Sequence, residues 1–437
     1  MTHCVRPLTD PDSTELVILG MIEPPPRDRR ARTPMQTSEH APRLHTDADS
    51  RNSAADDRGH LVHHLPRAVT RPSSVDELCA AAEYAEAQGL PHVVRGQGHS
   101  PAGSSQIPDG LVIDTNELRT VHDVDGDRIT VDTGACWSDV LRASLAQGRT
   151  PPVLTDYLEL SVGGTLSVGG IGGATHRHGL LTDNVLELQV RTPDGEVRTC
   201  SAAEDPQLFD AVRGGHGRHG IILRATLRLV PAPERVSRRL LRYNDLADFL
   251  ADQRRLMTGG EFDYLEGLAK PAEDGSEWEY VLDLATYYTR TPPMFADLGL
   301  RYRGAESQDV EYFEFLDGMA PHEELLRGTG AWHLPHPWLN AFLPDSTADE
   351  VIGGTVRDLD PADLGAPDGG LVLLYPFRTD VIRTPRRRLP DEPVAFLFAV
   401  LRTAPADDPG TLRRMLDGND ILRRRTLDAG GFIYLEP

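Results

Sequence analysis

A glycine-rich stretch, LTDYLELSVGGTLSVGGIGGAT, occupies residues 154–175. Six of these residues are glycines, and they follow the carboxylate of Asp156. Glycine lets the backbone approach a bound group closely and adopt positive φ, at a cost of roughly 0.5–1 kcal/mol per residue in conformational freedom. Successive backbone N–H groups can then cradle a flat or anionic group. A flexible linker would not need the interleaved leucines, valines and isoleucine. The stretch therefore predicts a buried loop that packs against a cofactor.

Composition limits the classes of function. With 437 residues the protein is long enough for two or three domains. Its net charge of −22 argues against a nucleic-acid partner. Four scattered cysteines without CxxC spacing predict neither a disulfide framework nor a zinc site. The apolar stretch at residues 16–22 follows acidic residues and lacks the features of a signal peptide. We expect a cytoplasmic monomer that binds neither nucleic acid nor a membrane.

Residues 61–233 combine helix and strand patterns into a predicted α+β domain. Residues 1–60, rich in proline, arginine and aspartate, predict a disordered tail. Ser73 or Ser74 can cap a helix that ends at Gly89. Strand, helix and hairpin patterns follow at residues 90–100, 110–118, 128–148, 184–201, 205–215 and 219–233. Asp194-Gly195 is the turn dipeptide of the hairpin.

A second domain is predicted over residues 234–405, after the proline-bounded segment VPAPERVS. It alternates helix and strand patterns again and carries the segments FDYLEG, GAWHLPHPWLN and GLVLLYPF. Residues 406–437 predict a helix that runs into a short strand.

Three short motifs allow more than one interpretation. Residues 215–220, GHGRHG, match the dinucleotide fingerprint GxGxxG, but a helix pattern precedes them and a strand follows, the reverse of a Rossmann unit. Residues 95–100, RGQGHS, form a glycine loop after a strand, with His99 either in a turn or at a bound pyrophosphate. His176 and His178 lack a carboxylate or cysteine at metal-ligand spacing, so we expect no metal site.

Asp156 is the strongest candidate for chemistry. Beside a cofactor it would lose hydration, and its pKa would rise into the range of a general base. The alternative is an aspartate that caps a helix or turn. Glu266, Trp332 and Trp338 could line a substrate cavity or belong to the core. No GxSxG elbow or P-loop is present, which disfavours hydrolases and kinases.

Several blocks together closely resemble the cytokinin dehydrogenases, members of the vanillyl-alcohol-oxidase superfamily of FAD-linked oxidases. The blocks that carry the resemblance are RGQGHS, WSDVLRASLAQG, TDYLELSVGGTLSVGGIGGATHRHG, NVLEL, DPQLFDAVRGG, FDYLEG and AWHLPHPWLN. The resemblance implies an α+β fold with a PCMH-type FAD-binding domain of two subdomains, followed by an α/β substrate domain. It also implies that residues 406–437 begin a return to the FAD domain, which the family continues beyond the last residues of this sequence.

The family's site residues map onto this sequence by motif. The resemblance implies that His99 carries FAD covalently, that Asp156 takes a proton from the substrate amine, and that Glu266 positions the adenine side. Asp156, Glu266, Trp332 and Trp338 would contact substrate. The implied cofactor-binding residues are Arg95, Gly96, Gln97, Gly98, His99, Ser100, Ser104, Asp156, Ser161, Gly164, Ser167, Gly170, Ile171, Ile222 and Tyr434.

The implied reaction oxidises the C–N bond in the side chain of an N6-alkenyl adenine to an imine, which water cleaves to adenine and an aldehyde. The electron acceptor would be a quinone-like compound or oxygen. Two alternatives stay open at this point. One is an FAD-linked oxidase that acts on a sugar or hydroxy acid, and the other is a truncated, non-catalytic flavoprotein.

Overall fold

The computed structural model describes residues 41–272, 277–294, 298–365 and 370–435. Residues 41–60, expected to be part of a disordered tail, are folded instead. They contain helix α1 (Ala48–Ala54), whose N-cap Asp47 accepts a hydrogen bond from the Ser50 amide at 2.8 Å. The polar composition has no apolar periodicity here, yet the segment is ordered by contacts with the rest of the protein. Residues 1–40 of the predicted tail lie outside the described residues.

A small parallel sheet follows α1 and packs on one helix. Its strand order is β1-β3-β2, with bounds β1 (Ala68–Thr70), β2 (His92–Arg95) and β3 (Leu111–Asp114). Helix α2 (Val75–Ala87) covers it and begins as predicted at Ser74, whose hydroxyl accepts from the Glu77 amide at 3.2 Å. Gly89 follows the helix with φ of +64°, a conformation that favours glycine.

A five-stranded antiparallel sheet has the order β4-β5-β9-β7-β8. Its strands are β4 (Val121–Asp125), β5 (Arg128–Asp132), β7 (Val185–Arg191), β8 (Val197–Ser201) and β9 (Ile221–Arg228). The predicted β7–β8 hairpin is present, with Gly195 at φ of +91°. Associated helices are α3 (Trp137–Leu145) and α6 (Pro206–Val212). The GxGxxG match lies between α6 and β9, so it does not open a helix.

An eight-stranded sheet contains every strand from β11 onward, in the order β14-β11-β13-β12-β16-β17-β15-β18. Its strands are β11 (Arg235–Tyr243), β12 (Tyr264–Pro271), β13 (Trp278–Tyr288), β14 (Gly304–Glu311), β15 (Leu339–Pro344), β16 (Leu371–Arg378), β17 (Val394–Leu401) and β18 (Phe432–Ile433). All its ladders are antiparallel.

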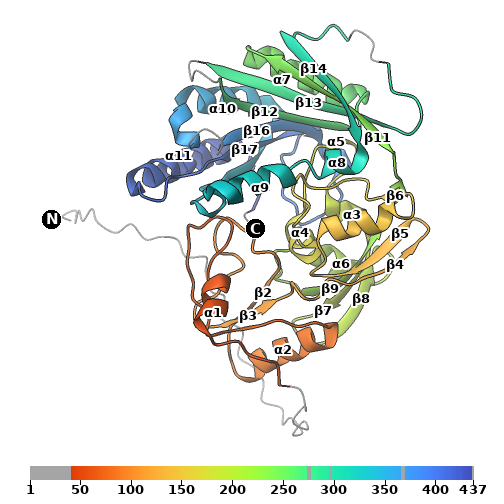
Figure 1. Cartoon of the computed structure of the whole chain (residues 1–437), viewed down its shortest axis with the longest axis vertical. Helices are drawn as coiled ribbons and strands as arrows, with labels where there is room; N and C mark the ends of the chain where they lie inside the picture. The colour runs from red at the N-terminus through yellow and green to blue at the C-terminus, as the bar shows by residue number, and fades with distance from the viewer. Residues whose placement is uncertain (1–40, 273–276, 295–297, 366–369, 436–437) are drawn as a thin grey trace, which may run out of the picture. The chain divides into compact units, whose positions relative to one another are not determined.

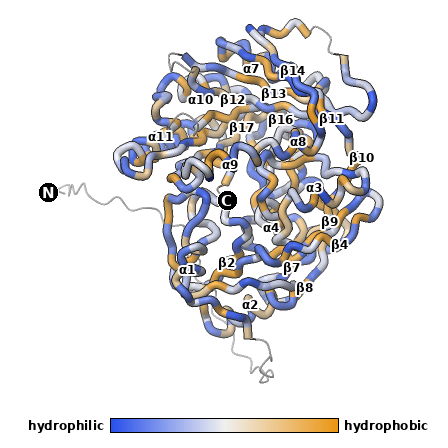
Figure 2. Tube along the Cα trace, viewed as in Figure 1, coloured by the Kyte–Doolittle hydropathy of each residue, from blue (hydrophilic) through white to orange (hydrophobic). Residues whose placement is uncertain are grey.

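Three long helices pack against this sheet, namely α7 (Leu246–Gly259), α10 (Asp345–Asp358) and α11 (Pro409–Asp428) (Figure 1). Hydrophobic residues run along β16 and β17 (Figure 2). Leu265, Leu282 and Leu374 share one buried cluster with Phe249 of α7. Because side chains alternate along a strand, Glu266 and Asp283 point to the opposite face of the sheet.

Shorter elements connect these layers. They are β6 (Arg149–Thr150), β10 (Val230–Pro231), α4 (Val162–Val168), α5 (Thr175–His178), α8 (Tyr312–Leu316), α9 (Ala320–Thr329) and the 3-10 turns η1 (Leu181–Asn184), η2 (Ala331–His333), η3 (Pro361–Leu364) and η4 (Thr379–Val381). The predicted α+β class is confirmed by these mixed helices and sheets. The domain limits at 233 and 405 stay a prediction.

Candidate functional site

The glycine-rich stretch is ordered and tightly packed. It contains α4 and α5, joined by glycines of which Gly169 and Gly170 have φ of +125° and +77°. A Cβ at Gly163 would overlap the Thr133 side chain, and one at Gly172 would overlap a backbone carbonyl. Much of the glycine requirement therefore comes from close packing within the protein.

The RGQGHS loop follows β2, as predicted, and meets the start of α4. A Cβ at Gly96 would overlap the Ser161 hydroxyl, and Gly98 has φ of +65°. The side-chain amide of Gln97 donates a hydrogen bond to the Cys136 sulfur at 3.2 Å. The two glycine-rich segments thus converge on one region, although 65 residues of sequence separate Gly96 from Ser161.

Asp57 holds this loop in place, and the sequence analysis missed it. Its carboxylate accepts hydrogen bonds from the Ser100 hydroxyl at 2.8 Å, the Gly103 amide at 2.6 Å and the Gly59 amide at 3.1 Å. Asp57 is buried, and burial raises its pKa while these hydrogen bonds lower it. Three donors converge on this buried carboxylate, so Asp57 fixes the loop. The polar residues around Asp57 in the sequence predicted a disordered tail instead.

His99 lies in an aromatic cluster. Its ring stacks on Tyr157 with 4.8 Å between centroids, and the rings of Trp332 and Trp338 lie at 6.3 and 6.2 Å. Burial, followed by the positive charge of Arg58, lowers the pKa of His99 to about 3. The imidazole is therefore neutral at physiological pH, with a lone pair on one nitrogen.

Arg58 connects the N-terminal segment to this cluster. Its guanidinium carbon lies 3.9 Å from the centre of the Trp332 ring, and its Nη1 donates to the Trp332 carbonyl at 2.8 Å. The Arg58 amide also donates to the Gly98 carbonyl at 2.9 Å. One buried residue thus contacts both the histidine loop and η2.

Asp156 and Glu266 form a pair of carboxyl groups. Each shifts the pKa of the other, and Tyr264 donates to Asp156 at 3.5 Å, the outer limit of a hydrogen bond. Burial raises the pKa of Asp156 to about 6. Burial and the neighbouring Asp156 carboxylate raise the pKa of Glu266 well above its ordinary value. Of the two acids, Glu266 therefore holds a proton more tightly than Asp156 does, so that a single proton shared by the pair lies on Glu266.

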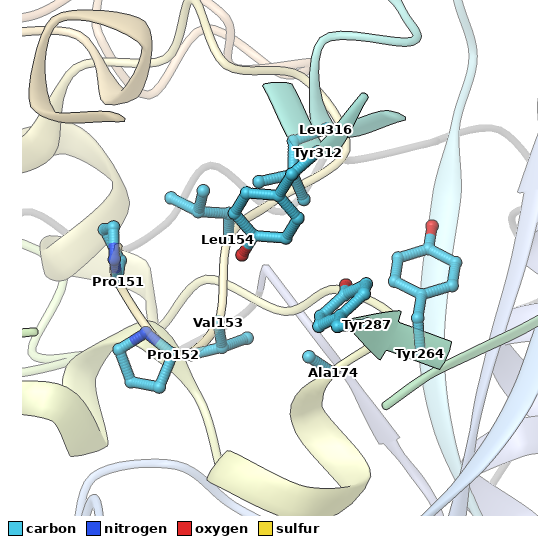
Figure 3. Close-up of a pocket in the computed structure, with 9 residues that line it drawn as sticks. All are labelled: Pro151, Pro152, Val153, Leu154, Ala174, Tyr264, Tyr287, Tyr312 and Leu316. Atoms are coloured by element: carbon cyan, nitrogen blue, oxygen red, sulfur yellow. The ribbon is translucent and has the colours of Figure 1, made fainter. Parts of the chain in front are cut away.

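Two buried polar atoms near the pair lack a partner within the described part of the protein. They are Glu266 Oε1 and the hydroxyl of Tyr375. Buried polar atoms are normally hydrogen-bonded, so this region has unused donor and acceptor capacity. A small pocket also borders Tyr264, and Figure 3 shows the nine side chains that surround it: Pro151, Pro152, Val153, Leu154, Ala174, Tyr264, Tyr287, Tyr312 and Leu316.

Tyr434 contacts the glycine-rich stretch directly. Its hydroxyl accepts a hydrogen bond from the Gly170 amide at 2.9 Å, across 264 residues of sequence. Strand β18 immediately before it pairs with β15 of the eight-stranded sheet. The C-terminal segment therefore adds β18 to the large sheet, packs α11 against it, and reaches the glycine-rich stretch through Tyr434.

The other sequence-predicted residues occupy varied positions. Ile222 is buried in β9 and Ile171 is partly buried, whereas Ser104 and Gly164 are exposed. The Ser167 hydroxyl donates to the Gly163 carbonyl at 2.7 Å. Arg95 donates to Ser105 at 3.2 Å, so Ser105 and not Ser104 contacts the histidine loop.

The two histidines of THRHG do not form a metal centre. His176 is buried between the carbonyls of Gly173 and Phe262, and His178 is exposed. Across the described ranges, no group of three or more histidine, cysteine, aspartate or glutamate side chains is arranged to hold a metal ion. In the same ranges, no helix is both long and apolar enough to cross a bilayer.

Comparisons with known proteins agree with this architecture. The sequence model of the FAD binding domain family matches residues 66–201. A crystal structure of 6-hydroxy-D-nicotine oxidase from Arthrobacter nicotinovorans superimposes with a TM-score of 0.67 over 92% of this protein and 88% of that one, at 22% identity. The fold is that of the PCMH-type flavoenzymes, and the protein is an FAD-dependent oxidoreductase.

More similar proteins show to which family of FAD-dependent oxidoreductases the protein belongs. The family model "Cytokinin dehydrogenase 1, FAD and cytokinin binding" matches residues 272–430. An uncharacterized oxidoreductase of the fasciation locus of Rhodococcoides fascians is 42% identical over 397 residues, which span 89% of each protein. Cytokinin dehydrogenase 10 of Oryza sativa subsp. japonica is 37% identical over 84% of this protein and 76% of its own length. The chain belongs to the cytokinin dehydrogenase family.

The residues present fit FAD. Gly96 and Gly98 bring bare backbone to the point where the histidine loop meets α4. His99 offers a neutral imidazole beside them. Glycine backbone suits close contact with a pyrophosphate.

Proposed function

We propose that the protein oxidises an N6-alkenyl adenine at the C–N bond that joins its side chain to the ring system. FAD, when bound, supplies the acceptor for the hydride that leaves the α-carbon of the side chain. The amine nitrogen must lose a proton in the same oxidation, because the product is an imine. Water then cleaves the imine to adenine and an aldehyde.

The observation that carries this proposal is the Asp156–Glu266 pair. A pKa of about 6 keeps Asp156 ionised at neutral pH yet basic enough to accept a proton from the amine. Glu266 keeps its own proton and can donate a hydrogen bond to a ring nitrogen. Trp332 and Trp338 would contact the substrate. Both rings lie next to His99, and the Trp332 ring also lies next to Tyr157.

Covalent attachment of FAD through His99, and cofactor contacts from Arg95, Gln97, Ser100, Ser161 and Tyr434, belong to the same proposal. Its support is the convergence of the histidine loop, α4 and the C-terminal segment. The electron acceptor is proposed to be a quinone-like compound or oxygen.

The test is the variant Asp156→Asn, mixed anaerobically with N6-isopentenyladenine. We expect it to retain bound flavin while the rate of bleaching of the visible band falls at least about 100-fold, the usual contribution of a general base. In the parent protein this rate should fall as the pH drops through about 6, because Asp156 becomes protonated. Unchanged bleaching by Asp156→Asn would remove Asp156 from the reaction.

A further inference from the structure

A third carboxyl group stands behind the Asp156–Glu266 pair. Asp283 of β13 lies directly opposite Glu266 of β12 in the antiparallel register. Side chains opposite each other on one face of a sheet have Cβ atoms about 5 Å apart, and like charges there repel. Asp283 is buried, with only 7% of its surface exposed. Three carboxyl groups therefore share a poorly hydrated region.

One cation compensates this cluster. Arg238 of β11 donates to both carboxylate oxygens of Asp283, with Nε at 2.9 and 3.1 Å and Nη2 at 2.5 Å. Register places Arg238 opposite Ala285, so Arg238 and Asp283 are diagonal neighbours on the same face. Burial raises the pKa of Asp283, and this forked, charge-assisted contact with Arg238 lowers it and so favours the ionised carboxylate.

Other groups that face Glu266 do not carry charge at neutral pH. They are phenols, whose pKa values are raised by burial, on β12, β13 and β16: Tyr264, Tyr287 and Tyr375. Within the described ranges, the charged groups around the pair are thus Asp283 and Arg238, whose opposite charges offset each other.

We propose that Arg238 is a positioning residue that keeps Asp283 ionised, so that the one proton of the three carboxyl groups stays on Glu266 and Asp156 remains free to accept a proton. The inference rests on the proposed function for the role of Asp156. The distribution of charge among the three carboxyl groups can be tested without turnover.

Infrared difference spectra of the FAD-containing protein at neutral pH provide that test. Arg238→Met should gain one carbonyl band of a protonated carboxylic acid, because Asp283 loses its cation and takes up a proton. The band should be absent from Arg238→Lys, which keeps the charge, and from the double variant Arg238→Met/Asp283→Asn. No new band in Arg238→Met would overturn the proposal.

The pH profile of anaerobic flavin bleaching provides the second readout. The acid limb of this profile is the fall in rate at low pH, where Asp156 becomes protonated. Asp283→Asn removes a negative charge next to the pair, which lowers the pKa of Asp156, so we expect the acid limb to move to lower pH by about one unit. The control is Arg242→Met. Arg242 lies on the same face of β11, pairs with Glu279 at 2.9 Å and Glu306 at 2.8 Å, and is similarly exposed.

If these residues only stabilised the sheet, Asp283→Asn and the control Arg242→Met would shift the acid limb alike. If Asp283→Asn leaves the limb in place, or Arg242→Met moves it equally, the proposal fails. If Asp156→Asn keeps the limb of the parent protein, the proposed function fails instead, and the infrared result still decides the state of Asp283.

Discussion

Asp156 and Glu266 have different proton affinities because their surroundings differ, although both are carboxylic acids. Burial is the largest cause of the raised pKa of both acids, but the Asp156 carboxylate raises the pKa of Glu266 further, whereas its interactions with Glu266 and Tyr264 lower that of Asp156. Burial disfavours charge on both, and their interaction leaves the proton on Glu266 rather than on Asp156. The result is a base and a hydrogen-bond donor side by side.

At the same scale, His99 makes a separate prediction. In His99→Ala, the flavin should dissociate when the protein is denatured in acid, whereas the parent protein should keep it through denaturation. Intact mass measured after denaturation checks this. The control is His178→Ala, since His178 is exposed outside the aromatic cluster. Flavin that stays attached to His99→Ala would place the covalent bond elsewhere.

At the scale of elements, the helix that Ser74 caps and the β7–β8 hairpin were predictable, whereas the helices α4 and α5 within the predicted buried loop and the hydrogen bonds of Asp57 were not. Ser74, Gly89 and Gly195 carry local signals of caps and turns, and each is confirmed. Asp57 acts through hydrogen bonds to residues about 43 positions away in sequence. Hydrogen bonds between distant residues produce no periodic pattern in the sequence, so this polar segment was predicted to be disordered.

Asp57→Ala should therefore destabilise the protein by about 2–4 kcal/mol, because it leaves buried donors without a charged acceptor. Asp109→Asn is the control, since Asp109 is exposed, pairs only with exposed Arg67 in the described structure, and has a φ of +52° that asparagine also tolerates. Its cost should stay below about 1 kcal/mol. Urea unfolding measures both. Equal losses of unfolding free energy in the two variants would show that the hydrogen bonds of Asp57 do not hold the histidine loop in place.

At the scale of the whole molecule, the site is assembled from distant parts of the sequence. Residues near 57, 99, 156, 266, 332 and 434 meet because the sheets and their connections bring them together. The sequence predicted most of these residues by motif and predicted the α+β class by pattern. Register across β11, β13 and β12, which places Arg238 and Asp283 behind Glu266, could not be read from local patterns.

Tyr434→Phe tests the contact between the C-terminal segment and the glycine stretch. The variant leaves the Gly170 amide without its acceptor, so we expect faster amide exchange at residues 162–173 and a loss of about 1–3 kcal/mol in stability. Tyr375→Phe is the matched control, because its buried hydroxyl has no partner among described residues. Exchange at 162–173 that does not change in Tyr434→Phe would contradict the contact.

The most direct measurement is one anaerobic turnover of the purified protein with N6-isopentenyladenine. The account predicts that the visible flavin band bleaches and that about one adenine per flavin is released with an aldehyde. A yellow protein that does not bleach, or a colourless protein, would contradict it.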